Sequence, residues 1–184
     1  MDEFLRLLLH LASYVAGLTG LALVLARFVP GGVALVRRTI GGQELWFAFA
    51  AALAMTLTSL YLSEILHYIP CRLCWFQRIF AYSNVIVLGW AAVRRDRNAW
   101  GPALTLAGIG ILFSTWHIAL DVGWIPDKGS CDPAVPCTVR WAWASNGATT
   151  IQVGAFCCFL FIIGLGLHAI AKPSPTSPTA PAEA

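Results

Sequence analysis

Five long apolar runs constrain this chain more than any other feature of its sequence. They cover residues 7–26, 45–66, 79–93, 101–124 and 149–171, and the third is longer if residues 74–78 are included. A helix needs about 20 residues to cross the hydrocarbon core of a bilayer. Because backbone groups inside lipid must pair within their own segment, each run is predicted to be a membrane-spanning helix. The expected fold is therefore an all-α integral membrane protein.

The composition agrees with this interpretation. Hydrophobic residues make up 58% of the chain and charged residues only 11%, whereas soluble domains are about 25% charged. Such a composition excludes an ordinary soluble domain and also a disordered chain. The net charge is +3 and no dense basic patch interrupts the apolar runs, so the sequence shows no sign of a nucleic-acid-binding surface.

The runs divide the chain into three predicted parts. Residues 1–44 form an N-terminal extension with one membrane helix, residues 45–172 a four-helix membrane domain, and residues 173–184 a proline-rich tail expected to be disordered and cytoplasmic. The first run has an alternative interpretation as a signal peptide. Its apolar stretch is longer than such a peptide needs, and no clear small-residue cleavage site precedes Arg27, so we expect a retained span.

The arginines predict how the helices are oriented. Lys and Arg accumulate in cytoplasmic loops, and the compact group of Arg94, Arg95 and Arg97 is the clearest such signal. With five spans, this group places the N-terminus and the two cysteine-containing loops on the outer side of the membrane. Outside the cytoplasm, paired cysteines are plausible disulfides.

The six cysteines fall into two outer-loop pairs and one mid-span pair: Cys71 with Cys74, Cys131 with Cys137, and Cys157 with Cys158. For the four loop cysteines, three interpretations stay open: a redox relay, two static disulfides, or a metal site. Zinc is disfavoured because five residues separate the second pair and neither pair has polar knuckle flanks. Trp75 stands where a c-type haem motif requires histidine. The mid-span cysteines are expected to pack as small hydrophobes.

The Cys71-x-x-Cys74 spacing is the sharper feature. Three residues apart on a helix, both sulfurs share one face, and Pro70 suits the first position of a helix. The pair is therefore expected at the N-terminus of the third helix, where the helix dipole favours a thiolate. Arg78 lies one turn deeper on the same face. It either stabilises a developing anion there or snorkels to the lipid headgroups.

The sequence around this pair resembles the DsbB family of disulfide-bond formation proteins, and is most similar to the shorter BdbC-type members. The resemblance rests on residues 59–64, Ser-Leu-Tyr-Leu-Ser-Glu, and residues 69–79, Ile-Pro-Cys-Arg-Leu-Cys-Trp-Phe-Gln-Arg-Ile. It continues through His117, Cys131 and the Val-Pro-Cys that ends at Cys137, and covers roughly residues 45–171.

The resemblance implies a four-helix membrane bundle that binds a quinone, ubiquinone or menaquinone, near the outer surface. By motif, Cys71 and Cys74 are similar to the pair that the quinone reoxidises, and Cys74 to the cysteine beside the quinone ring. Arg78 and His117 are similar to residues that support the quinone site. The implied location is the plasma (inner) membrane of a bacterium, with the cysteine loops on the extracytoplasmic side.

By the same resemblance, Cys131 and Cys137 correspond to the pair that oxidises a DsbA-like thioredoxin-fold partner. The implied activity is a quinone-dependent protein-disulfide oxidoreductase that supports disulfide formation in extracytoplasmic proteins. Two features depart from the family: residues 1–44 add a span to the family core, and the Cys131–Cys137 loop is shorter than in the best-known members. The short loop leaves the partner-docking surface undefined.

A different class of protein is the alternative: a non-catalytic multi-pass membrane protein whose outer loops are stapled by structural disulfides. Arg78, one turn behind the C-x-x-C pair, separates the two hypotheses, because a staple does not need an arginine there.

Overall fold

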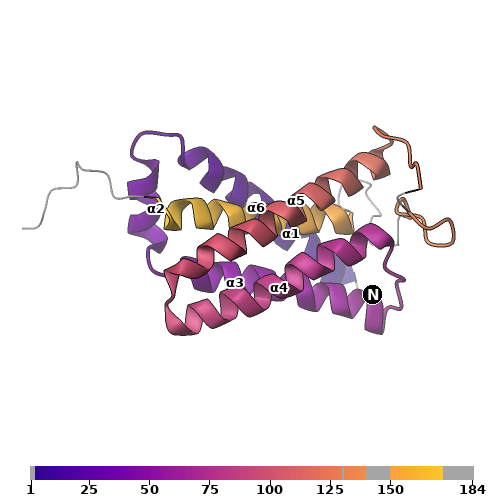
Figure 1. Ribbon diagram of the computed structural model, residues 1–184, viewed down its shortest axis with the longest axis horizontal. Helices are drawn as coiled ribbons and strands as arrows, with labels where there is room; N and C mark the ends of the chain where they lie inside the picture. Colours follow the sequence, from indigo (N-terminus) through magenta and orange to yellow (C-terminus); the bar gives the residue numbers. More distant parts are fainter. Residues whose placement is uncertain (1–2, 130, 140–149, 172–184) are drawn as a thin grey trace, which may run out of the picture.

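The computed structural model describes residues 3–129, 131–139 and 150–171. Five long helices form one bundle (Figure 1): α1 (Glu3–Ala26), α3 (Glu44–Leu60), α4 (Arg72–Arg94), α5 (Trp100–Val122) and α6 (Ile151–Ala169). Within the described residues there is no β-strand, and extended pairing is limited to one bridge between Asp132 and Val135. The prediction of an all-α membrane protein, with a four-helix bundle and an extra N-terminal helix, is confirmed.

The described residues also contain three shorter helices: α2 (Gly32–Ile40) after α1, the π-helix η1 (Tyr61–Ile65) continuing α3, and the 3-10 helix η2 (Arg97–Ala99) leading into α5. The apolar runs left residues 32–40 as part of the connection between the first two predicted spans, so helix α2 was not predicted. Val36 is buried there, while Arg37 and Arg38 occupy the last turn of α2, where the helix dipole favours cations. The segment folds as a helix because it has an apolar residue to bury and cations at the correct end.

Among the described residues, four helices are long and apolar enough to cross a membrane: Leu7–Ala26, Glu44–Ile65, Arg97–Val122 and Ile151–Ala169. Helix α4 has a similar length, 23 residues, but polar side chains lower its hydropathy. Gln77, Arg78 and Asn84 are all buried, so α4 turns its polar residues toward the interior of the bundle. Intramembrane polar residues that face a bundle interior usually mark a functional site.

Helices α3 to α6 form the four-helix bundle, and α1 packs mainly against α6 on its outer side. Alanines are frequent in the core, including Ala48, Ala52, Ala91, Ala103 and Ala107. Small residues let helix backbones approach closely, which is the main source of helix association inside lipid. The fully buried Phe159 of α6 then fills the space that the small side chains leave.

One close approach in this core yields a stability prediction. A Cβ atom added at Gly110 of α5 would lie 2.4 Å from Cζ of Phe159, whereas a Cβ added at Gly108 would meet no atom within 4 Å. We expect Gly110→Val to destabilise the protein by about 1–3 kcal/mol through overpacking, and Gly108→Val to have little effect. Thermal unfolding of both variants in detergent measures the difference. Equal melting temperatures for the two would contradict this packing.

The two ends of the bundle differ in chemistry. The N-terminal end of α1, the segment before α4 and the loop after α5 gather at one end, while α2 and the α4–α5 turn lie at the other (Figure 1). The predicted placement of the N-terminus on the same side as the cysteine loops agrees with this arrangement. At the opposite end, Arg37 donates to the carbonyl of Ala171 and Arg97 to that of Ala169, so both arginines bind carbonyls at the C-terminal end of α6.

Candidate functional site

The C-x-x-C pair lies at the start of α4, as predicted, but the capping residue differs from the expected one. Cys71 is the N-cap, with extended backbone angles, and its Sγ accepts a hydrogen bond from the backbone N–H of Cys74 at 3.3 Å. Arg72 is the first helical residue, so Pro70 lies before the cap and the prediction that it opens the helix was wrong. The cysteine sulfur can satisfy one of the free N–H groups at the helix start, which proline cannot do.

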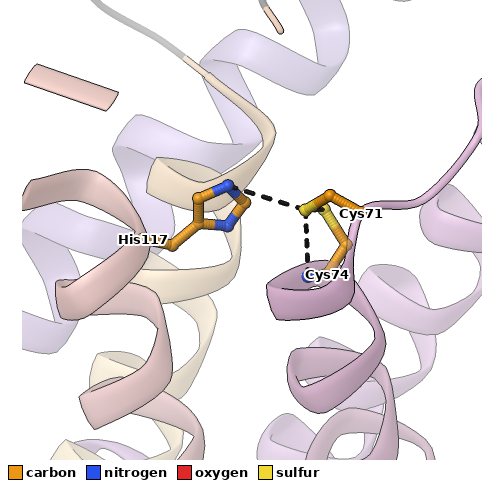
Figure 2. A group of neighbouring side chains, drawn as sticks. All are labelled: Cys71, Cys74 and His117. Carbon is orange, nitrogen blue, oxygen red and sulfur yellow. Dashed lines mark hydrogen bonds between the residues drawn. The ribbon is translucent and has the colours of Figure 1, made fainter. Parts of the chain in front are cut away.

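His117 of α5 lies beside this pair, with its ring nitrogen facing the sulfur of Cys71 (Figure 2). The Sγ atoms of Cys71 and Cys74 are 2.7 Å apart, and Nε2 of His117 is 3.8 Å from Sγ of Cys71. The imidazole is 2% exposed, so its ring nitrogens pair with protein groups.

Two further contacts define the tautomer of His117. The side-chain N–H of Gln77 donates to Nδ1 at 3.2 Å, so Nδ1 carries no proton. Nε2 then holds the proton and donates to the backbone carbonyl of Cys137 at 2.9 Å. The imidazole therefore presents its Nε2–H toward both Cys71 and the second cysteine loop. Sequence reasoning gave Gln77 no special role, because only the fold brings it against His117.

The second cysteine pair is a disulfide between Cys131 and Cys137, with Cα atoms 5.7 Å apart. Both cysteines are buried in one cluster with Cys71, Leu73 and Leu120. A small cavity of about 60 Å³ lies beside this cluster, and it is lined by Cys71, Cys74, Arg78, His117 and Cys137. The structure therefore brings together every predicted site residue, with Cys131 on the far side of its own disulfide.

Arg78 faces the interior and does not snorkel. It is 8% exposed, and its Nε and one terminal nitrogen donate to the side-chain oxygen and the carbonyl of Ser59, both at 2.8 Å. Its guanidinium carbon also lies 5.1 Å from the centre of the Trp75 ring, which adds a cation–π contact. Sequence reasoning missed the contact with Ser59, which lies in α3, 19 residues earlier.

The charge in this site is expected on Cys71. The hydrogen bond with Cys74 is the main influence that holds the pKa of the Cys71 thiol well below its usual range, and His117 contributes, while burial opposes both. Cys71 precedes α4 and is outside the membrane-spanning segment. A thiolate at Cys71 is the form that can attack a neighbouring disulfide.

This shift predicts how the reduced protein reacts with an alkylating agent. Because the pKa of Cys71 is lowered, its thiolate should persist down to pH values at which a thiol with the ordinary pKa of 9.0 is protonated. Iodoacetamide should therefore modify Cys71 readily at pH 6, as measured by peptide mass spectrometry from pH 4 to 9. His117→Ala should move the midpoint upward, since His117 helps to lower this pKa. A wild-type midpoint near 9.0 would contradict the assignment.

The fold and the site together define a class of protein. It is a multi-pass helical membrane protein with two cysteine pairs that face each other at one end of the bundle. Residues 43–158 match the model of the family described as disulfide bond formation protein DsbB. The chain belongs to the DsbB family, and the predicted resemblance is confirmed.

Individual relatives agree with this assignment. A probable disulfide formation protein of Oceanobacillus iheyensis is 40% identical over 116 residues, which cover 59% of this chain and 76% of that protein. One of Deinococcus radiodurans is 37% identical over 130 residues, covering 66% and 85%. A probable disulfide formation protein C 1 of Bacillus cereus is 41% identical over 101 residues, covering 53% and 73%. No solved structure matches the chain.

Proposed function

We propose that this chain is a quinone-dependent protein-disulfide oxidoreductase that reoxidises a DsbA-like thioredoxin-fold partner. Membership of the DsbB family makes it a membrane disulfide formation protein; the quinone, the partner and the roles of individual residues are our proposal. The observation that carries it is the small cavity on which Cys71, Cys74, Arg78, His117 and Cys137 converge. A pair of structural staples requires neither a shared cavity nor a buried arginine.

The proposed order of electron transfer follows from which cysteine of the Cys131–Cys137 disulfide lines the small cavity with Cys71. Cys137 lines the cavity shared with Cys71, whereas Cys131 does not, so Cys131 is the cysteine that the partner attacks. A partner thiolate forms a mixed disulfide with Cys131, and Cys137 leaves as a thiolate. Because Cys131 is buried, docking of the partner must first expose it.

The second exchange transfers the electrons inward. Cys137 attacks Cys71 of an oxidised Cys71–Cys74 pair, and Cys74 leaves as a thiolate. The second partner thiol then attacks the mixed disulfide between the partner and Cys131, which forms the partner's disulfide and releases Cys131. Cys131 next attacks Cys137 in the Cys137–Cys71 disulfide and releases Cys71. The Cys131–Cys137 disulfide is restored, the partner is oxidised, and both electrons rest on the Cys71–Cys74 dithiol. His117, with its N–H between the two pairs, stabilises the thiolate of Cys71 as it leaves.

The residues around Cys74 fit a quinone. Cys74 and Arg78 also line a second cavity of about 560 Å³, whose other walls are mostly apolar. An apolar pocket of this size with a few polar groups at one point is typical of a small-molecule site. A bound quinone would supply a two-electron, two-proton acceptor. Cys74 and Arg78 would hold its head, and the fixed charge of Arg78 would favour negative charge beside the sulfur.

We also propose the membrane placement. The cysteine end of the bundle would face the extracytoplasmic side of a bacterial plasma membrane, because arginines gather at the opposite end. The division into residues 1–44, 45–172 and 173–184 remains a prediction, and the last of these parts lies outside the described residues.

The purified protein should oxidise a reduced DsbA-like dithiol protein only when quinone is supplied. Loss of partner thiols and formation of quinol, followed together, should occur in a one-to-one ratio of dithiol to quinone. Removing either cysteine pair should abolish both signals. Oxidation that proceeds equally without quinone, or in a variant lacking Cys71 and Cys74, would refute the proposal and favour structural disulfides.

A further inference from the structure

The large cavity is long as well as apolar. It begins at Cys74 and Arg78 and extends between α1, α3, α4 and α6 as far as Phe47. Ser59 and Phe47 both line it from α3, and the helix rise between them is about 18 Å. A cavity of this length fits a ligand with a polar head and a linear hydrocarbon tail better than it fits a compact ligand.

The polar groups of the cavity are concentrated at its redox end. Arg78 and Tyr82 both donate to Ser59 there, and Cys74 lies beside them. Along the α1 wall, the hydroxyls of Ser13 and Thr19 donate to carbonyls of their own helix, so they present little polarity to an occupant. The cavity therefore offers a charged, redox-active end and an apolar length.

Helix α1 supplies one complete wall of this cavity. Ala12, Ser13 and Ala16 line it, and their small side chains keep the space open. The helix is held in place by its contact with α6: a Cβ added at Gly20 would lie 2.7 Å from the backbone nitrogen of Phe161. The match to the DsbB family begins at residue 43, so this wall comes from a part of the chain that the match does not include.

We propose that α1 forms the binding wall for the polyprenyl tail of the quinone, so that this N-terminal helix sets the preference for long-tailed acceptors. The inference rests on the proposed function, since it takes the acceptor to be a quinone. Of the occupants that fit an apolar channel, a quinone is favoured over a phospholipid acyl chain because the channel ends at a dithiol and a buried arginine. A phospholipid would bring no electron acceptor to Cys74.

The decisive comparison is Ala16→Phe against Leu18→Phe in the full-length protein. Ala16 lines the cavity, while Leu18 does not line it and is 69% exposed on the same helix. Each variant is titrated in detergent with two quinones of identical head group, one with a long polyprenyl tail and one with none. Equilibrium binding gives the dissociation constants.

Ala16→Phe should weaken binding of the long-tailed quinone about tenfold, the effect of losing a few buried methylenes, and leave the tailless quinone unchanged. Leu18→Phe should change neither. An equal loss for both quinones, or no loss for either, would overturn the role of α1. Failure of the wild type to bind either quinone would overturn the proposed function itself, so the two failures are distinguishable.

Two further measurements do not depend on the folding of one variant. Ala54→Phe narrows the same cavity from α3 and should reproduce the selective loss of long-tailed binding. In the wild type, long-tailed quinone should slow alkylation of Cys158, which lines the cavity, more than that of Cys157, which packs against Gly17 of α1. Equal protection of Cys158 by phospholipid without quinone would overturn the choice of occupant.

Discussion

A Cys74→Ser variant should lose quinone-dependent turnover by a factor of about a thousand or more, because serine cannot form the Cys71–Cys74 disulfide that the proposed relay requires as electron acceptor. The substitution replaces one sulfur atom with oxygen, and a serine hydroxyl can still donate to Cys71, which keeps the hydrogen bond that most lowers the pKa of that thiol. The variant should therefore keep its fold and a reactive thiolate at Cys71. Quinol formation with a reduced partner measures the loss.

The same variant should accumulate a mixed disulfide between the two loops. Cys71 and Cys137 line one cavity, so a solitary Cys71 thiolate can attack Cys137 and release Cys131 as a thiolate. Alkylation of the released Cys131 traps the Cys71–Cys137 bond, which Cys131 would otherwise reverse. Mass spectrometry of unreduced peptides should show Cys71 linked to Cys137. Cys157→Ser is the matched control, since Cys157 lies away from both cavities against α1, and it should turn over normally. Wild-type turnover of Cys74→Ser would refute the relay.

The parts of this protein that could be predicted from sequence are those encoded by local patterns. Apolar length predicted the helices, and the spacing of Cys71 and Cys74 predicted that their sulfurs share the first turn of α4. The same spacing correctly placed Arg78 on that side of the helix, where it lines both cavities with Cys74. These inferences hold because helix geometry alone fixes which residues three or four positions apart can meet.

The parts that could not be predicted depend on contacts between distant segments. The pairing of Gln77 with His117 joins residues 40 positions apart, and that of Arg78 with Ser59 joins residues 19 positions apart. Ser59 and Gln77 both lie in the motif segments that carry the family resemblance, but neither residue type indicates which distant side chain it contacts. The channel beside α1 depends in the same way on α1 packing against α6, which the length and hydropathy of the first run do not specify.

Arg78→Met should raise the KM for quinone about ten- to a hundredfold, which corresponds to the loss of a charged hydrogen-bonding group from a dry site. Methionine keeps much of the length and apolar volume of the arginine stem, so packing between α3 and α4 should survive. Because Arg78 lies with Cys74 at the end of the large apolar cavity, where the proposal places the quinone head, we expect its charge to act mainly on the quinone and only weakly on exchange with the partner. Single-turnover reduction of the Cys131–Cys137 disulfide should therefore remain near the wild-type rate.

Ser59→Ala separates the charge of Arg78 from its positioning. Ser59 accepts two hydrogen bonds from the guanidinium, one through its side chain and one through its carbonyl, and alanine removes only the first. The charge remains in the site with one anchor, so KM should rise only a few fold. A steady-state series of wild type, Ser59→Ala and Arg78→Met should then show graded KM values. An unchanged KM in Arg78→Met would remove the arginine from the quinone site and assign its buried contacts to helix packing alone.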